Sequence, residues 1–231
     1  MRSAKAIFIK QLQDTFKNRM ILIQFAMFPI MAFVMTELVA KANDGIPNNM
    51  FVTMFAAIFV GMTPLVMTNS AIAEDREHKS LRFLVMAGVK PYEYLLGIGG
   101  FVLVVCSLAS VVFGLIGGFA GMEFVKFVSV LILGSVASIL LGSIIGILSK
   151  NQQAATAVGT PVFMILAFTP MIASFNETIE KAADIFYTQQ INVLVNDFSV
   201  GVTKPFLIIM ANIAILLVLF ILAYKKKGLK I

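Results

Sequence analysis

The sequence has few charged residues, no tryptophan and a single cysteine, and each shortage excludes a class of protein. Charged residues make up 13% of the 231 residues, about half the share that is usual in soluble domains. Hydrophobic residues make up 59%, which is more apolar surface than a soluble core needs. The lone Cys106 excludes an internal disulfide and a multi-cysteine metal site. Without Trp, an interfacial aromatic belt would consist of Tyr and Phe. This composition predicts an integral membrane protein.

Sites for chemistry are also missing from the sequence. No G-x-x-x-x-G-K-[ST] phosphate loop occurs, so we expect no ATP binding of the usual kind by this chain. The only histidine, His78, stands between Glu77 and Lys79 in a polar stretch, where a solvated position is expected. We find no metal-ligand cluster and no nucleophile–base pairing, and the first 19 residues lack the continuous apolar core of a cleavable signal peptide. The chain is therefore predicted to be neither an enzyme nor a metal protein, with no cofactor of its own.

What the sequence does contain is six apolar segments long enough to cross a bilayer, which takes about 20 helical residues. They predict an all-α integral membrane fold, with residues 1–231 forming a single transmembrane domain. Turn-rich or polar residues separate the segments. The predicted spans are residues 20–39, 50–73, 95–119, 127–148, 158–175 and 205–224.

The distribution of positive charge predicts the orientation. Six spans place both termini and the loop at residues 74–94 on one side, and that side carries 14 of the 18 Lys and Arg residues. The positive-inside rule then places the termini and this loop in the cytoplasm, with the protein in the cell membrane. Membrane topology explains the net charge of +6, so a nucleic-acid partner is not needed.

Two segments outside the spans have an amphipathic pattern. Residues 1–19 repeat apolar side chains every four positions and predict an interfacial helix, either a simple lipid anchor or an elbow helix that also helps to hold a partner. Residues 176–204 would lie outside the cell as one or two short helices. They form either a folded surface loop or an outer gate, and the candidate gate residues are Ile179, Phe186 and Val193.

The spans carry almost no ionisable residues, and Glu37 lies near the outer end of the first. A proton- or ion-coupled carrier usually needs such residues near the membrane midplane, so this class is disfavoured. Polar uncharged and methionine side chains suit a lipophilic or amphipathic cargo. The candidate cargo path comprises Gln24, Thr63, Met67, Asn69 and Met164.

The polar loop between spans two and three carries the motif D-R-E-H-K-S-L-R-F-L at residues 75–84, followed by G-V-K-P-Y-E-Y-L-L-G at residues 88–97. A second short loop, S-K-N-Q-Q-A-A at residues 149–155, precedes span five. In this order around six spans, the motifs resemble those of the permease subunits of exporter-type ABC transporters, the "ABC type 2" membrane family. That family's signature is close to E-R-E-x-G-T-L-E-x-L. The sequence departs from it at Lys79, where Gly is frequent, and at Arg82, where Glu is common.

The resemblance implies a permease subunit that pairs with a second permease subunit and uses a separate ATPase subunit, which binds ATP and Mg²⁺. It would export a drug, an antimicrobial peptide or a lipid. The loop at residues 74–94 would contain a coupling helix that docks on the ATPase. An ATP-independent channel or secondary carrier, and a membrane immunity or scaffold protein, remain as alternatives. The residues predicted to couple to the ATPase are Asp75, Arg76, Glu77, Lys79, Leu81, Arg82, Leu84 and Val85.

Overall fold

The structure is a computed structural model that describes residues 2–17, 19–43, 45–173, 175–197 and 201–227. All regular secondary structure in these ranges is helical, and no strand occurs among them. The fold class predicted from the sequence is therefore confirmed as all-helical. The elements are α1 (Arg2–Lys17), α2 (Arg19–Met35), η1 (Thr36–Ala40), α3 (Met50–Glu77), α4 (Ser80–Met86), α5 (Pro91–Ile116), α6 (Gly121–Leu148), α7 (Gln152–Ala173), α8 (Glu177–Ala183), α9 (Tyr187–Asn196) and α10 (Thr203–Lys227).

Six helices in the described ranges are long and apolar enough to cross a membrane, as the sequence predicts, and the chain is a multi-pass membrane protein. These segments are Leu22–Ala40, Met50–Glu77, Pro91–Ile116, Gly121–Leu148, Gln152–Ala173 and Thr203–Lys226. Several of them, including α3, α5, α6 and α7, extend into residues that the sequence places in loops. α3 continues through the charged residues 74–77, and α6 and α7 begin about six residues earlier than predicted. A helix can include charged side chains where it emerges from an apolar layer, so hydropathy alone places these ends too far inward.

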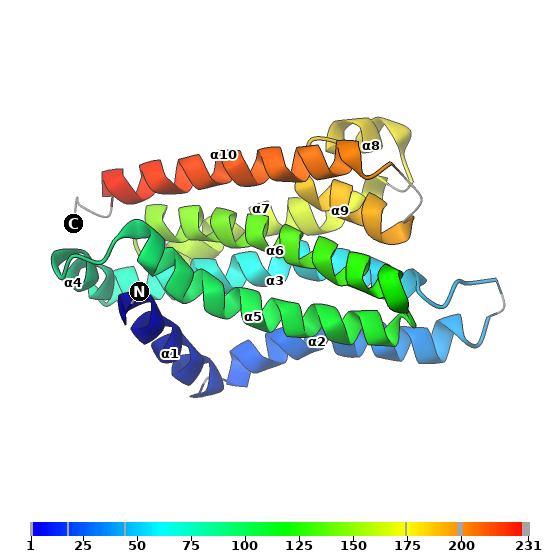
Figure 1. The fold of residues 1–231 in the computed structure, drawn as a ribbon, viewed down its shortest axis with the longest axis horizontal. Helices are drawn as coiled ribbons and strands as arrows, with labels where there is room; N and C mark the ends of the chain where they lie inside the picture. The colour runs from blue at the N-terminus through cyan, green and yellow to red at the C-terminus, as the bar shows by residue number, and fades with distance from the viewer. Residues whose placement is uncertain (1, 18, 44, 174, 198–200, 228–231) are drawn as a thin grey trace.

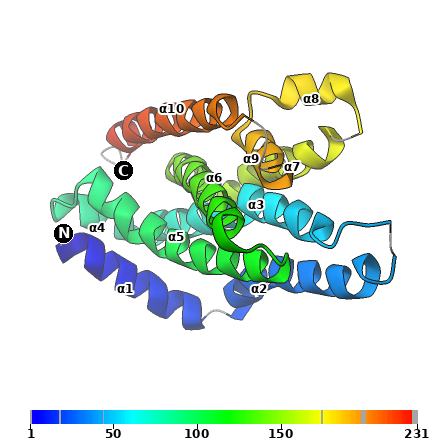
Figure 2. The ribbon, with the colours of Figure 1, turned by 45° about the vertical axis from the view of Figure 1, so that its right-hand side comes forward.

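The spanning helices surround α3 and α6, which form the centre of the bundle (Figures 1 and 2). In each of these two helices 67% of the span is buried, against 22% for the first span and 11% for α10. Small residues allow α3 and α6 to approach closely. A Cβ atom added at Gly142 would lie 2.4 Å from the backbone oxygen of Leu65. The outer helices α2, α7 and α10 leave much apolar surface uncovered.

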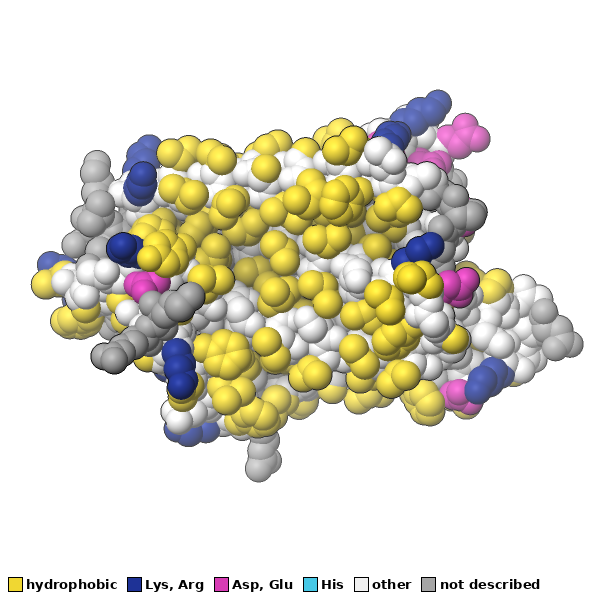
Figure 3. Space-filling model, viewed as in Figure 1, with side chains coloured by type: hydrophobic (Ala, Val, Ile, Leu, Met, Phe, Trp, Pro, Cys, Tyr) yellow, Lys and Arg dark blue, Asp and Glu magenta, His cyan; other side chains and the backbone are white. Residues whose placement is uncertain are grey.

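The two ends of the bundle differ from its middle. In Figure 3 apolar side chains cover the middle of the visible face, while the blue and magenta charged side chains gather at its two ends. One end, here called the α4 end, holds α4, the last turn of α10 and the start of α5 (Figure 1). The opposite end, here called the α8 end, holds α8, α9 and the connection between η1 and α3 (Figure 1). This is the pattern of a protein with one apolar belt and two polar caps.

At the α8 end, the segment predicted to be one or two short helices forms α8 and α9. α9 packs against α3, α6, α7 and α10. Its Tyr187 side chain is buried, and the Tyr187 and Ser138 hydroxyls are hydrogen-bonded at 2.6 Å. Gln190 Nε2 donates to the backbone oxygen of Asp184 at 2.6 Å. These contacts make α9 part of the bundle core.

Candidate functional site

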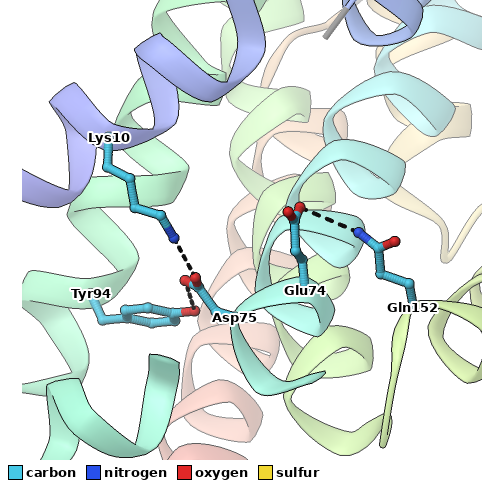
Figure 4. Close-up of polar contacts among 5 residues, drawn as sticks. All are labelled: Lys10, Glu74, Asp75, Tyr94 and Gln152. Carbon is cyan, nitrogen blue, oxygen red and sulfur yellow. Dashed lines mark hydrogen bonds and ion pairs between the residues drawn. The ribbon is translucent and has the colours of Figure 1, made fainter. Parts of the chain in front are cut away.

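The last turn of α3, residues 74–77, is the point where five helices of the α4 end are joined. Its four side chains contact residues of other helices, as Figure 4 shows for Glu74 and Asp75. They contact α1, α5, α6 and α7. We call this group of residues and their partners the α3 terminal cluster.

Asp75 is the buried centre of the cluster. The residue is 5% exposed. Lys10 Nζ of α1 donates to Asp75 Oδ1 at 2.6 Å, and the Tyr94 hydroxyl of α5 donates to Asp75 Oδ2 at 2.9 Å (Figure 4). A buried carboxylate needs such partners, since an unpaired charge in the interior is costly. Asp75 therefore fixes α1 and α5 against the end of α3.

The pKa of Lys10 lies above its usual value of 10.5. Partial burial acts to lower it, but the hydrogen bond and the negative charge of Asp75 raise it by more. The ammonium group is therefore charged throughout the physiological range, as the pairing with Asp75 requires.

The other three side chains of the turn contact α6 and α7. Arg76 Nη1 donates to the backbone oxygen of Ile147, near the end of α6. Glu77 Oε2 accepts from the backbone nitrogen of Gln152 at 3.0 Å. Glu74 Oε2 accepts from Gln152 Nε2 at 3.3 Å (Figure 4). Because Gln152 is the first residue of α7, the carboxylates lie at a helix N-terminus, where unpaired backbone N–H groups favour negative charge.

A sharp turn separates α3 from α4. His78 is the C-cap residue that follows α3, and the next residue, Lys79, has a φ of 60° in the left-handed region. The Lys79 nitrogen donates to the Arg76 oxygen at 3.0 Å, which closes the end of the helix. Glycine is the usual residue for this conformation. The need for φ > 0 explains why a glycine would suit this position, where the sequence has lysine.

The short helix α4 has one buried and one exposed apolar side. Leu81 is 0% exposed and belongs to a buried apolar cluster with Ile72, Tyr94 and Ile98, and Leu84 packs against the same cluster. On the exposed side, Phe83 is 68% and Met86 73% exposed. Arg82 is exposed as well. α4 is thus anchored by leucine and presents Phe, Met and Arg outward.

The structure separates the residues that the sequence groups as one coupling surface. The side chains of Asp75, Arg76 and Glu77 make contacts within the chain, and Leu81 is buried. Lys79 and Arg82 are exposed, Leu84 is partly buried, and the side chain of Val85 lies outside the described part. Sequence reasoning missed Phe83 and Met86 as exposed residues. Their spacing of three positions, like that of Leu81 and Leu84, is the signal that two apolar faces share one short helix.

The residues of the predicted cargo path differ in their exposure. Thr63, Met67 and Asn69 are buried within the bundle. Asn69 Nδ2 donates to the backbone oxygen of Ala155 at 2.8 Å and thereby joins α3 to α7. Met164 is 51% exposed on the outer side of α7, and Gln24 is partly exposed on α2.

The predicted gate residues lie in or beside α8 and α9. Ile179 is 36% exposed on α8. Phe186 precedes α9 and packs against the core. Val193 lines a cavity at the α8 end.

Among the described residues, no group of three or more His, Cys, Asp or Glu side chains could hold a metal ion. A comparison with protein-family models matches residues 3–225 to the family described as "ABC-2 family transporter protein". The match includes the whole α3 terminal cluster and α4. No curated protein matches the chain at a significant level.

Proposed function

Because the chain belongs to the ABC-2 family of transporter proteins, we propose that it is the permease subunit of an ATP-driven exporter. ATP and Mg²⁺ would bind to a separate ATPase subunit, consistent with the lack of a phosphate loop in the sequence. The cargo would be lipophilic or amphipathic, such as a drug, an antimicrobial peptide or a lipid. The chain itself would carry no catalytic residues.

In the proposed orientation, the α4 end faces the cytoplasm of the cell and the α8 end faces outward. The excess of Lys and Arg on the loops and termini of the α4 end supports this orientation. α1 would lie on the inner membrane surface as an elbow helix. Its Phe16 is 67% and its Leu12 36% exposed, and apolar side chains on an amphipathic helix suit the boundary between headgroups and acyl chains.

The observation that carries the proposal is the exposed apolar side of α4. Phe83 and Met86 lie beyond the ends of the spanning segments, on a helix that Leu81 anchors to the bundle. Burial of a large apolar side chain contributes about 1.5–3 kcal/mol. A partner that covers Phe83 and Met86 would therefore gain much of its binding energy from them. Arg82 and Lys79 would add charged contacts at the rim.

Coupling would then pass through the α3 terminal cluster. α4 follows α3 after a two-residue turn, and the last turn of α3 holds α1, α5, α6 and α7 by hydrogen bonds. A force on α4 would displace the end of α3 together with these neighbours. Asp75, Arg76 and Glu77 would act in coupling by transmitting this movement inside the permease.

A second permease subunit would complete the transporter. The spans formed by α2 with η1 and by α7 are only 22% and 28% buried, which leaves apolar faces for lipid or for a second copy. Gln24 and Met164 on these outer faces would lie along a path between two subunits. Thr63, Met67 and Asn69, which are buried in the bundle, would support that path from behind.

The docking surface is tested with the double variant Phe83→Ala with Met86→Ala. The tagged chain is purified from its host in mild detergent, and co-purified ABC ATPase subunits are quantified by mass spectrometry. We expect at least a tenfold loss of the ATPase, from two apolar contacts of about 1.5–3 kcal/mol each in the partner interface.

The matched control is Phe175→Ala with Met122→Ala. These residues are of the same types, are 83% and 69% exposed, and lie at the α8 end. The control should retain the ATPase. Equal recovery of the ATPase with both double variants would refute the docking surface. If no ATPase co-purifies with the unmodified chain, the result would favour a channel or scaffold.

A further inference from the structure

A cavity of about 490 Å³ lies at the α8 end, between α3, α7, α8 and α9. Its volume is in the range of pockets that hold drug-sized molecules, roughly 300–1,000 Å³. Much of its wall is made of flexible apolar side chains, which adapt to ligands of different shape. These include Met50, Met54, Ile58, Met171 and Phe175.

Two of the described residues that line the cavity, Gln189 and Glu180, carry acceptor oxygens. Gln189, on α9, is 3% exposed and lines the cavity, and its Oε1 atom has no hydrogen-bond partner in the described part of the chain. In its neighbour Gln190, by contrast, Nε2 donates hydrogen bonds to the backbone oxygen and to Oδ1 of Asp184. Buried polar atoms are normally paired, and this Oε1 atom has almost no accessible surface, so a donor in the cavity reaches it only after the Gln189 side chain turns toward the cavity.

Glu180 of α8 is the second residue with acceptor oxygens, and it is exposed to solvent. It is the only charged residue that lines the cavity among the described residues, and no ion pair involves it there. The remaining polar lining residues, Thr53, Asn192 and Asn196, are uncharged. The cavity therefore has one carboxylate, on α8, and mostly apolar lining residues on α3 and α7.

We propose that this cavity binds an amphipathic organic cation that carries a primary or secondary ammonium group. The ammonium would pair with the Glu180 carboxylate and donate a hydrogen bond to Gln189 Oε1 once that side chain turns toward the cavity, and the apolar body would contact the methionine-rich wall. An anion would be repelled by Glu180, and a neutral molecule without a donor would leave Gln189 unpaired. Binding of the cation to this cavity needs no ATPase. Only the further claim that the bound cation is a cargo of the transporter rests on the proposed function.

The probe for this site is dansylcadaverine, a fluorescent amphipathic amine, with its uncharged N-acetyl derivative as the comparison ligand. The purified chain is placed in phosphatidylcholine nanodiscs without any ATPase, and dansyl fluorescence is titrated. We expect saturable binding of the amine that is at least tenfold tighter than that of the N-acetyl derivative.

Three variants locate the binding. Glu180→Gln should weaken binding of the amine by about threefold to fivefold, as expected for a charge pair with an exposed carboxylate. Glu177→Gln removes the same charge from the same helix but does not line the cavity, so it should bind like the unmodified chain. Val193→Phe, which narrows the cavity from α9, should abolish saturable binding.

Equal effects of Glu180→Gln and Glu177→Gln, or equal binding of the amine and its acetyl derivative, would overturn the proposal. Saturable binding that survives Val193→Phe would also place the ligand elsewhere. Because no ATPase is present, these results are independent of the docking experiment on α4.

Discussion

The ion pair between α1 and α3 can be tested by the variant Lys10→Met, which keeps the aliphatic part of the side chain. Lys10 Nζ lies 2.6 Å from Asp75 Oδ1, and the two side chains are 52% and 6% exposed. After the substitution, the buried carboxylate would retain the Tyr94 hydroxyl and lose its counter-charge.

The expected loss in the free energy of unfolding follows from the unequal exposure of Lys10 and Asp75. Removal of one partner from a buried ion pair costs about 3–5 kcal/mol, and an exposed pair contributes about 0–1 kcal/mol. With one partner buried and the other half-exposed, we expect Lys10→Met to lower the free energy of unfolding by about 2 kcal/mol. Adding Asp75→Asn removes the unpaired charge while an amide oxygen can still accept from Tyr94. The double variant should therefore regain about 1 kcal/mol relative to Lys10→Met.

Cys106 provides the assay. It is the only cysteine of the chain and is fully buried in α5, so a fluorogenic maleimide reacts with it only when the bundle opens. Heating the purified chain with this reagent gives a Tm. For a chain of this size a change of 1 kcal/mol shifts the Tm by about 2–4 °C, so Lys10→Met should lower the Tm by about 4–8 °C.

The pH dependence gives an independent check of the mechanism. Because pairing raises the pKa of Lys10 in the folded chain, its stabilisation is fully present below the unfolded value of 10.5. It is lost as the pH rises through the folded pKa. The Tm difference between the unmodified chain and Lys10→Met should be constant from neutral pH to about pH 9 and shrink above pH 10.5. A difference that does not change up to pH 12, or a double variant less stable than Lys10→Met, would refute the reasoning.

Two further predictions concern backbone geometry and use the same Tm assay. Lys79→Gly should raise the free energy of unfolding by about 0.5–1 kcal/mol, because glycine adopts the left-handed conformation of this residue without strain. Gly88→Ala should lower the free energy of unfolding, because Gly88 has a φ of 80° and an alanine there would be strained although no atom lies near its Cβ. A destabilising Lys79→Gly would show that the lysine side chain has a structural role of its own. Gly142→Ala should destabilise by more than about 2 kcal/mol, since its Cβ would meet the Leu65 backbone oxygen at 2.4 Å. Gly100→Ala on α5 has open space and should be neutral or stabilising, and equal effects at the two glycines would contradict the close packing of α3 and α6.

The six spans could be predicted from the sequence because the signal is local. A run of about 20 apolar residues needs a helix to satisfy its backbone in a membrane, whatever its neighbours are. The ends were less certain, as residues 74–77 show. These four residues are charged, but they continue α3 because each side chain finds a partner on another helix. Whether such partners exist depends on the packing of the whole bundle.

The inward and outward faces of α4 could not be assigned from the sequence. Leu81, Phe83, Leu84 and Met86 are all apolar, so their spacing in this helix of seven residues indicates two apolar faces but not which of them is buried. The choice depends on the apolar cluster below α4, to which Tyr94 and Ile147 contribute from distant parts of the chain. The cavity at the α8 end likewise combines residues from α3, α7, α8 and α9.

These placements change which residues could select the ATPase in the proposed complex. A charge distinguishes between partners only if the partner can reach it, and Asp75 is 5% exposed and already paired with Lys10 and Tyr94. A substitution at Asp75 would therefore lower the stability of the permease and weaken the binding of every ATPase to the same extent. Arg82 is exposed beside Phe83, so reversing its charge should change the preference among ATPases without lowering the Tm. Recognition would thus depend on the outer side of α4, and transmission on the buried end of α3.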